Sequence, residues 1–149
     1  MSSERPSLAL RQRVAERACG CCEDCFTRRR FSCDPFSVEH DLPQSRGGTS
    51  EPGNLALACQ GCNNHKHMHV GGVDPVTGAG VPLYHPRTGI WSEHFAWTED
   101  YTEIVGLTAR GRATVLRLQL NRPEVVALRT VLAAARLHPP DYPCTRTNP

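Results

Sequence analysis

The sequence predicts an α+β fold in which short strands and helices surround a site of four cysteines. Two Cys-x-x-Cys pairs enclose a polar segment, which is the arrangement of a metal-stabilised domain. Apolar residues recur with helical spacing near both ends of the chain, and three short apolar runs separated by turns lie between them. The chain has 149 residues, 39% of them hydrophobic and 21% charged, which is typical of one globular domain of ordinary size.

Helices are predicted at residues 7–18 and from residue 108 to residue 137. In the first, Leu10, Val14 and Ala18 follow one another every four residues, and Ser7 is a suitable N-cap. The second region is interrupted at residues 121–123, where Asn121 is the expected N-cap of a further helix and Pro123 occupies its first turn.

Short strands are predicted where apolar runs lie between turn residues. The first covers residues 36–38 and places Glu39 and His40 at its end, because Pro43 stops any longer strand. The others cover residues 81–84, 93–97 and 102–107. His94, inside the third of these four runs, is interpreted as a structural or rim residue.

Eight cysteines are many for a chain expected to be cytoplasmic, where they indicate a metal more often than a disulfide. Cys22 with Cys25 and Cys59 with Cys62 would supply four thiolates to one structural Zn²⁺. The register of the first pair stays open, because Cys19 and Cys22 also form a Cys-x-x-Cys pair and Cys21 lies between them. Thioredoxin-like redox chemistry is the alternative, but neither pair has a βαβ context.

Residues 38–69 contain the groups that metal-assisted phosphodiester cleavage needs: a base, ligands for a divalent ion and a rigid mount. Glu39 and His40 stand side by side, and a polar loop with Gly47 and Gly48 follows. A helix beginning near Cys59 would carry Asn63 and His67 one turn apart, a spacing that suits two ligands of one ion. His65 and His69 would face solvent.

Sixteen of the seventeen basic side chains are arginine, and Lys66 is the single lysine. A retained lysine within the central segment indicates a chemical role, although a lone solvated lysine is the alternative. The run Arg28, Arg29 and Arg30 either contacts phosphates or forms a solvated turn. No apolar run approaches the length of a membrane span, so we expect a cytoplasmic protein without a membrane partner.

The central segment resembles the HNH (ββα-metal) nuclease family, in its zinc-bearing prokaryotic branch. The resemblance rests on Glu39-His40, Pro43, Ser45-Arg46-Gly47-Gly48, Asn54-Leu55 and Cys59-x-x-Cys62-Asn63-x-x-Lys66. It implies one nuclease domain over residues 7–138. This domain would have a zinc-clamped ββα-metal core at about 19–70, an extension of strands and helices at about 71–138, and a loose tail at 139–149.

The resemblance also implies roles for individual residues. His40 would be the general base, Asn54 would orient it, and Arg46 and Lys66 would hold phosphates. Glu39 and Asn63 would bind one catalytic Mg²⁺ or Mn²⁺, since oxygen ligands favour hard ions. Many relatives have glycine where this chain has His67, so His67 is a possible third ligand that would tolerate Ni²⁺ or Zn²⁺ as well.

The sequence thus predicts a metal-dependent endonuclease that nicks DNA with low sequence specificity and leaves 5′-phosphate ends. The alternative is a zinc-stabilised module that binds nucleic acid without cutting it. Metal storage or sensing is a third hypothesis, but it does not explain the glycine loop or the acid–histidine pair. A net charge of +2 and the lack of a reading motif indicate contacts to the phosphate backbone. A protein partner or a homodimer stays open, as does the pathway.

Overall fold

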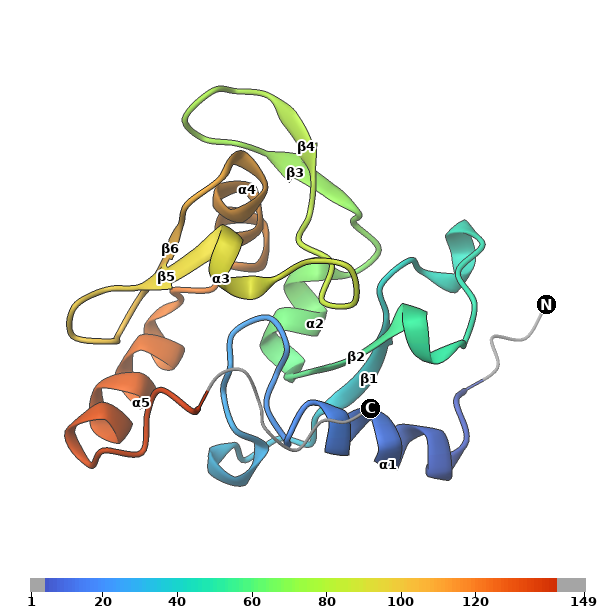
Figure 1. Cartoon of the computed structure of the whole chain (residues 1–149), viewed down its shortest axis with the longest axis horizontal. Coiled ribbons are helices and arrows are strands. Elements are labelled where there is room, and N and C mark those ends of the chain that lie inside the picture. Colours follow the sequence, from blue (N-terminus) through green and yellow to red (C-terminus); the bar gives the residue numbers. More distant parts are fainter. Residues whose placement is uncertain (1–4, 142–149) are drawn as a thin grey trace.

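The computed structural model describes residues 5–141, and short helices and strands alternate through this part of the chain (Figure 1). The predicted loose tail lies mostly outside the described residues, which end before 142. The elements in chain order are α1 (Leu8–Arg17), η1 (Arg29–Phe31), β1 (Ser37–His40), η2 (Gln44–Arg46), η3 (Pro52–Asn54), β2 (Leu55–Ala58), α2 (Gln60–Lys66), β3 (Gly71–Val73), β4 (Gly80–Pro82), α3 (Trp91–His94), β5 (Phe95–Trp97), β6 (Ile104–Gly106), α4 (Ala109–Leu118) and α5 (Pro123–Ala134). The predicted α+β class is confirmed.

The centre of the fold is an antiparallel pair of strands followed by a helix. β1 and β2 pair with His40 opposite Leu55 and Ser37 opposite Ala58, and α2 begins directly after β2. α1 packs against this pair, where Val14, Ala15 and Ala18 form a buried cluster with Leu55 and Leu57. The predicted N-cap of α1 is confirmed, because the Ser7 hydroxyl accepts a hydrogen bond from the Leu10 amide at 3.2 Å.

Strand β1 extends through His40, and this decides where its polar side chains point. Successive side chains of a strand face opposite sides. Val38 packs against the α1 cluster and shares its face of the strand with His40. Glu39 faces the other side and is buried, where it meets Lys66 of α2.

The extension after α2 and the cysteines share one core. The four cysteines of the two pairs cluster with apolar residues of the extension, namely Leu83, Tyr84, Trp91, Phe95, Ile104, Leu118 and Leu120. Figure 1 shows α2 between the β1–β2 pair and α4. A single domain over residues 7–138 requires such a shared core, and its boundaries stay a prediction.

The predicted strand at residues 93–97 is partly wrong, because Glu93 and His94 belong to the short helix α3 and only Phe95–Trp97 is extended. The helical turn places Trp91 and Phe95 one above the other, with ring centroids 5.2 Å apart, and both rings are buried. A strand would hold these rings too far apart for that contact.

One strand after α2 was not predicted, and one predicted cap is corrected. Residues 71–73 lie outside the predicted strands but form β3, which pairs with β4. A Cβ at Gly72 would lie 3.2 Å from the Leu83 side chain and 3.5 Å from the Ala113 carbonyl oxygen, so this strand position lies close to α4. Asn121 does not cap α5, because its amide bonds both backbone groups of Ile104 at 2.7 and 2.8 Å.

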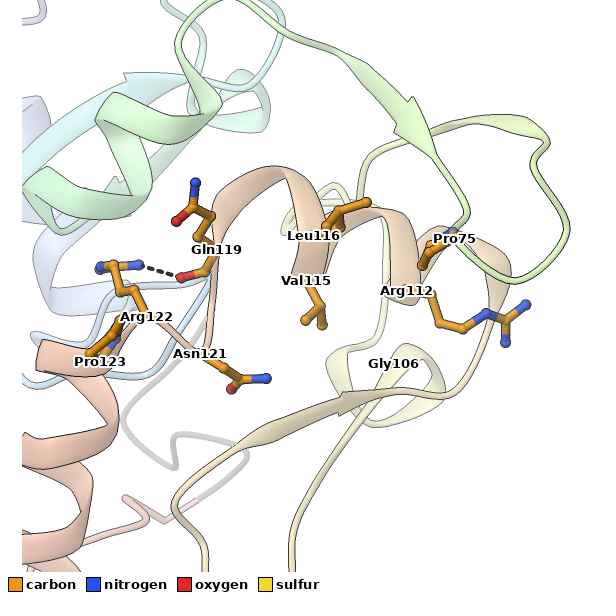
Figure 2. Close-up of a pocket in the computed structure, with 9 residues that line it drawn as sticks. All are labelled: Pro75, Gly106, Arg112, Val115, Leu116, Gln119, Asn121, Arg122 and Pro123. Atoms are coloured by element: carbon orange, nitrogen blue, oxygen red, sulfur yellow. Dashed lines mark hydrogen bonds between the residues drawn. The ribbon is translucent and has the colours of Figure 1, made fainter.

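α5 therefore begins at Pro123, and Arg122 occupies the N-cap position without a side-chain cap bond. Figure 2 shows Arg122 near a cavity of about 530 Å³ that runs along α4 and β6, with its guanidinium bonded to the Gln119 carbonyl. None of the predicted catalytic residues lines this cavity. Within residues 5–141 no helix combines the length and apolar character needed to cross a membrane.

Candidate active site and metal centre

Four buried thiols converge at one end of α2. The Sγ atoms of Cys22, Cys25, Cys59 and Cys62 all lie within 4.8 Å of one another, and those of Cys25 and Cys59 are 3.7 Å apart. A tetrahedral Zn²⁺ with its usual sulfur ligands separates neighbouring sulfur atoms by about 3.8 Å. The donor set and spacing therefore fit a structural zinc, as predicted, and the first pair is Cys22 with Cys25 rather than Cys19 with Cys22.

The first cysteine turn is fastened to strand β2. Glu23 exchanges hydrogen bonds with Leu57, since its amide donates to the Leu57 carbonyl at 2.9 Å and its carboxylate accepts from the Leu57 amide at 2.8 Å. Arg87 of the extension forms an ion pair with the same carboxylate. A zinc ion would thus clamp the start of the core, its second strand and the extension together.

Arg122 is the cation that faces the four thiols. Its guanidinium nitrogens lie 3.4 Å from the Cys59 sulfur and 3.7 Å from the Cys62 sulfur. A tetrathiolate zinc site carries excess negative charge, which a buried guanidinium offsets. The approach depends on Gly61, because a Cβ there would lie 2.4 Å from the guanidinium.

His40 lies at the end of β1 with its Nε2 atom 2.9 Å from the Ser50 hydroxyl. Partial burial lowers the pKa of His40 below its ordinary value, against a smaller opposing effect of the Asp41 charge. The imidazole is therefore neutral at pH 7 and able to accept a proton.

Asn54 holds the loop that carries Ser50. Its Oδ1 accepts from the Leu42 amide at 2.8 Å, and its Nδ2 donates to the carbonyls of Leu42 and Thr49 at 3.0 and 2.8 Å. These bonds join the chain just after His40 to the chain just before Ser50. The orienting role proposed for Asn54 rests on these three bonds.

Gly48 lets the same loop close against the backbone. A Cβ at this position would lie 1.7 Å from the Leu42 carbonyl oxygen, a distance that no side chain tolerates. We expect Gly48→Ala to displace the loop, to cost about 1–3 kcal/mol of stability as overpacking does, and to reduce any activity that depends on His40. Thermal unfolding and cleavage rate measure the two effects.

Gly53→Ala is the matched control, because a Cβ at Gly53 meets nothing within 4 Å. If Gly48→Ala and Gly53→Ala behave alike in both measurements, the loop does not position His40 in this way.

Lys66 is buried and paired with two carboxylates. Its Nζ lies 3.3 Å from Glu39 and 3.1 Å from Asp41, and only 6% of its side chain is exposed. Burial alone would lower the pKa of Lys66, but the nearby carboxylates outweigh it and raise that pKa. The predicted contact of Lys66 with phosphate is not available in this arrangement, since the ammonium faces the interior.

Negative charge exceeds positive charge around Lys66. Asp24 is 2% exposed, and neither of its carboxylate oxygens has a hydrogen-bond partner within the described residues. The Oδ2 atom of Asp41 also accepts no hydrogen bond and lies 3.7 Å from His85. Burial, followed by the charge of Asp24, raises the pKa of Glu39 to about 8. Unpartnered carboxylate oxygens beside Glu39 are the chemistry that a hard divalent cation requires.

The predicted partners of Glu39 are not gathered around it. α2 ends at Lys66, so His67 lies beyond the helix at φ 49° and is exposed, instead of one turn above Asn63. The chain turns there to reach β3 and β4, where the Leu83 amide bonds the Val70 carbonyl. Asn63 is half-buried and lines a cleft with Ser37 and Val38. Among residues 5–141 only the four cysteines form a metal-type cluster of three or more histidine, cysteine or acidic side chains.

The arginines predicted to bind nucleic acid lie at the surface. Arg29 and Arg30 are exposed in η1, and Arg28 is half-buried beside them. Arg46 is exposed in η2, in the loop between His40 and Ser50.

Comparison with known protein families decides what this arrangement is. Residues 19–69 match the model of the HNH endonuclease family. These residues form an HNH domain. They include both cysteine pairs, β1, β2, α2 and the loop that carries Ser50. Neither curated proteins nor solved structures gave a significant match to the chain.

The HNH domain therefore carries the zinc-type cluster within its matched residues, and it indicates a nuclease that acts on nucleic acid.

Sequence reasoning did not find Ser50, Asp41, Asp24 or Arg122. Asp41 could have been predicted from local spacing. It lies two residues after Glu39, so in a continuing strand its side chain faces the same side as that of Glu39. The other three reach the site through tertiary packing and could not be predicted in this way.

Proposed function

We propose that the chain is an endonuclease that hydrolyses phosphodiester bonds of DNA with His40 as general base. The observation that carries the proposal is the position of His40, whose Nε2 atom lies 2.9 Å from the Ser50 hydroxyl at the end of β1 inside the HNH domain. When Nε2–H donates to the Ser50 hydroxyl, the lone pair of Nδ1 is free to take the proton of an attacking water.

Glu39 and Asn63 are the proposed ligands of a catalytic Mg²⁺ or Mn²⁺. Unpartnered carboxylate oxygens lie beside Glu39, and Asn63 would have to leave the wall of its cleft to join them. Such an ion, when bound, offsets the charge that develops on the phosphate and on the departing 3′ oxygen, which leaves 5′-phosphate ends. His67 would have to leave its place after α2 to join them. Arg46 is the proposed phosphate contact of the loop.

One base and one ion cut one strand at a time, so we expect nicking. The proposed contacts are to phosphates, so we expect low sequence specificity. Duplex cleavage would need a homodimer, a protein partner or two visits.

The test is conversion of supercoiled plasmid to open circle with Mg²⁺, with Mn²⁺ or without a divalent ion, followed by end-labelling of the products. The proposal expects ion-dependent nicking with 5′-phosphate ends at many sequences. The absence of cleavage with every ion would contradict it.

One observation favours a second function, a zinc-stabilised module that binds nucleic acid without cutting it. Lys66 already pairs with Glu39 and Asp41, which leaves less negative charge for an ion. Plasmid that is retarded on a gel but never nicked would support this module.

A further inference from the structure

A basic cleft lies beside the HNH core, on the α1 side of the β1–β2 pair. It has a volume of about 570 Å³, and its walls come from the residues before α1, from α1, from η1, from the start of β1 and from α2. Its polar lining includes Arg5, Arg11, Arg29 and Asn63. A second hollow of about 420 Å³ shares Ala15 and Arg29 with the cleft and is lined by Arg28 and Arg30 as well. The two hollows therefore adjoin one another at Ala15 and Arg29, and together they are called the basic track.

The arginines of this track lack acidic partners. No carboxylate of the described residues forms an ion pair with Arg5, Arg11 or Arg29. Arginines of the extension are instead engaged by the protein, as Arg87 is by Glu23 and Arg112 by Asp74. Arg11 even has a buried Nε that bonds no protein atom. Three arginines from separate segments thus line one cleft, and none of them forms an ion pair within the described residues.

The cleft lies close to the proposed general base. Val38 lines it, and His40 lies two residues further along the same face of β1, about 7 Å away at the rise of a strand. Asn63, a proposed ligand, also lies in its wall. His40 itself does not line the cleft, but a phosphate bound beside Val38 would lie only two strand residues from it.

We infer that this cleft binds the phosphate backbone of the nucleic-acid strand presented to His40, with Arg5, Arg11 and Arg29 as the contacts. The inference rests on the proposed function and assigns the path of its substrate. Guanidinium groups bind phosphates through paired hydrogen bonds and do not read bases, so binding here is tolerant of sequence and sensitive to salt.

The experiment compares two triple variants that remove the same charge. One is Arg5→Gln with Arg11→Gln and Arg29→Gln. Its control is Arg13→Gln with Arg110→Gln and Arg117→Gln, three positions that line neither hollow. Affinity for a fluorescent DNA duplex is measured without added divalent ion between about 50 and 200 mM salt. Zinc content and circular dichroism show that both variants are folded.

Each lost phosphate contact lowers the slope of log affinity against log salt by about 0.9. In the cleft triple the magnitude of this slope is expected to decrease by about 2–3, and in the control triple by less than half as much. Equal losses in the two triples, or an unchanged slope in the cleft triple, would overturn the inference. Arg29→Gln alone, at an exposed position, gives the same test with a loss of about 0.9 if the cleft triple does not fold.

The outcomes separate this inference from the proposed function. If the plasmid is never nicked and the salt dependence of binding falls only in the cleft triple, the inference that the cleft binds nucleic acid is supported and the proposed nuclease activity is contradicted. If the plasmid is nicked but the salt dependence of binding is unchanged in the cleft triple, the binding role of the cleft is contradicted and the proposed nuclease activity is supported.

Discussion

Cys59→Ser is expected to leave the chain unfolded and without stoichiometric zinc. Cys59 is 6% exposed, its sulfur is one of the four that converge, and it accepts a hydrogen bond from the Cys62 amide as the N-cap of α2. A structural zinc site contributes on the order of 10 kcal/mol to folding. This is comparable with the whole stability of an ordinary domain, about 5–15 kcal/mol.

The cluster also forms part of the core that joins the HNH domain to the extension, since it packs with Trp91 and Phe95. Loss of the ion should therefore unfold both parts together, in a single transition that circular dichroism and zinc analysis follow. Cys33→Ser is the matched control, because Cys33 is free, exposed and outside the cluster. A Cys59→Ser protein that stays folded and retains one zinc would contradict the clamp.

Lys66→Met is expected to destabilise the protein by about 3–5 kcal/mol, the usual result of removing one member of a buried ion pair. The ammonium is the one side-chain cation within ion-pair distance of Glu39 in the described residues, and it also pairs with Asp41. Without it, the Asp41 carboxylate, and Glu39 above its pKa of about 8, would be buried with no compensating charge. Chemical denaturation above pH 8 measures the loss.

A compensated variant separates charge imbalance from lost packing. Lys66→Met combined with Glu39→Gln and Asp41→Asn keeps the shapes but removes the carboxylate charges, so most of the stability should return. Added Mg²⁺ or Mn²⁺ should also stabilise Lys66→Met if the carboxylates bind the ion, because a ligand of the native state raises its stability. If Lys66→Met is as stable as the wild type, the ammonium does not hold these carboxylates together.

Local spacing was sufficient to predict α1, the short strand that ends in the acid–histidine pair, and two cysteine pairs at one metal, whereas the ββα core was predicted from the family resemblance. A Cys-x-x-Cys turn fixes the separation of its own sulfur atoms, and the periodicity of residues 7–18 fixes the buried face of α1. The family match over residues 19–69 confirms the resemblance that these motifs indicated.

The sequence could not predict interactions that depend on where distant segments meet. The sequence favours a phosphate contact for Lys66, with a solvated lysine as the alternative, and its burial beside Glu39 and Asp41 depends on tertiary packing. His67 has helical spacing from Asn63, but the chain leaves the helix there because β3 and β4 must pack on α4. Ser50 reaches His40 only after Gly48 and Asn54 close the loop.

The most direct test of the account is the nicking rate of His40→Ala beside wild type, at equal zinc content and with Mg²⁺ or Mn²⁺. His40 contributes no core contact and no thiol, so the variant should fold, bind DNA and retain zinc. The account predicts that nicking falls by a factor on the order of 10²–10⁴, the contribution of a general base. Nicking at the wild-type rate by a zinc-loaded His40→Ala protein would contradict the assignment of His40 as the base.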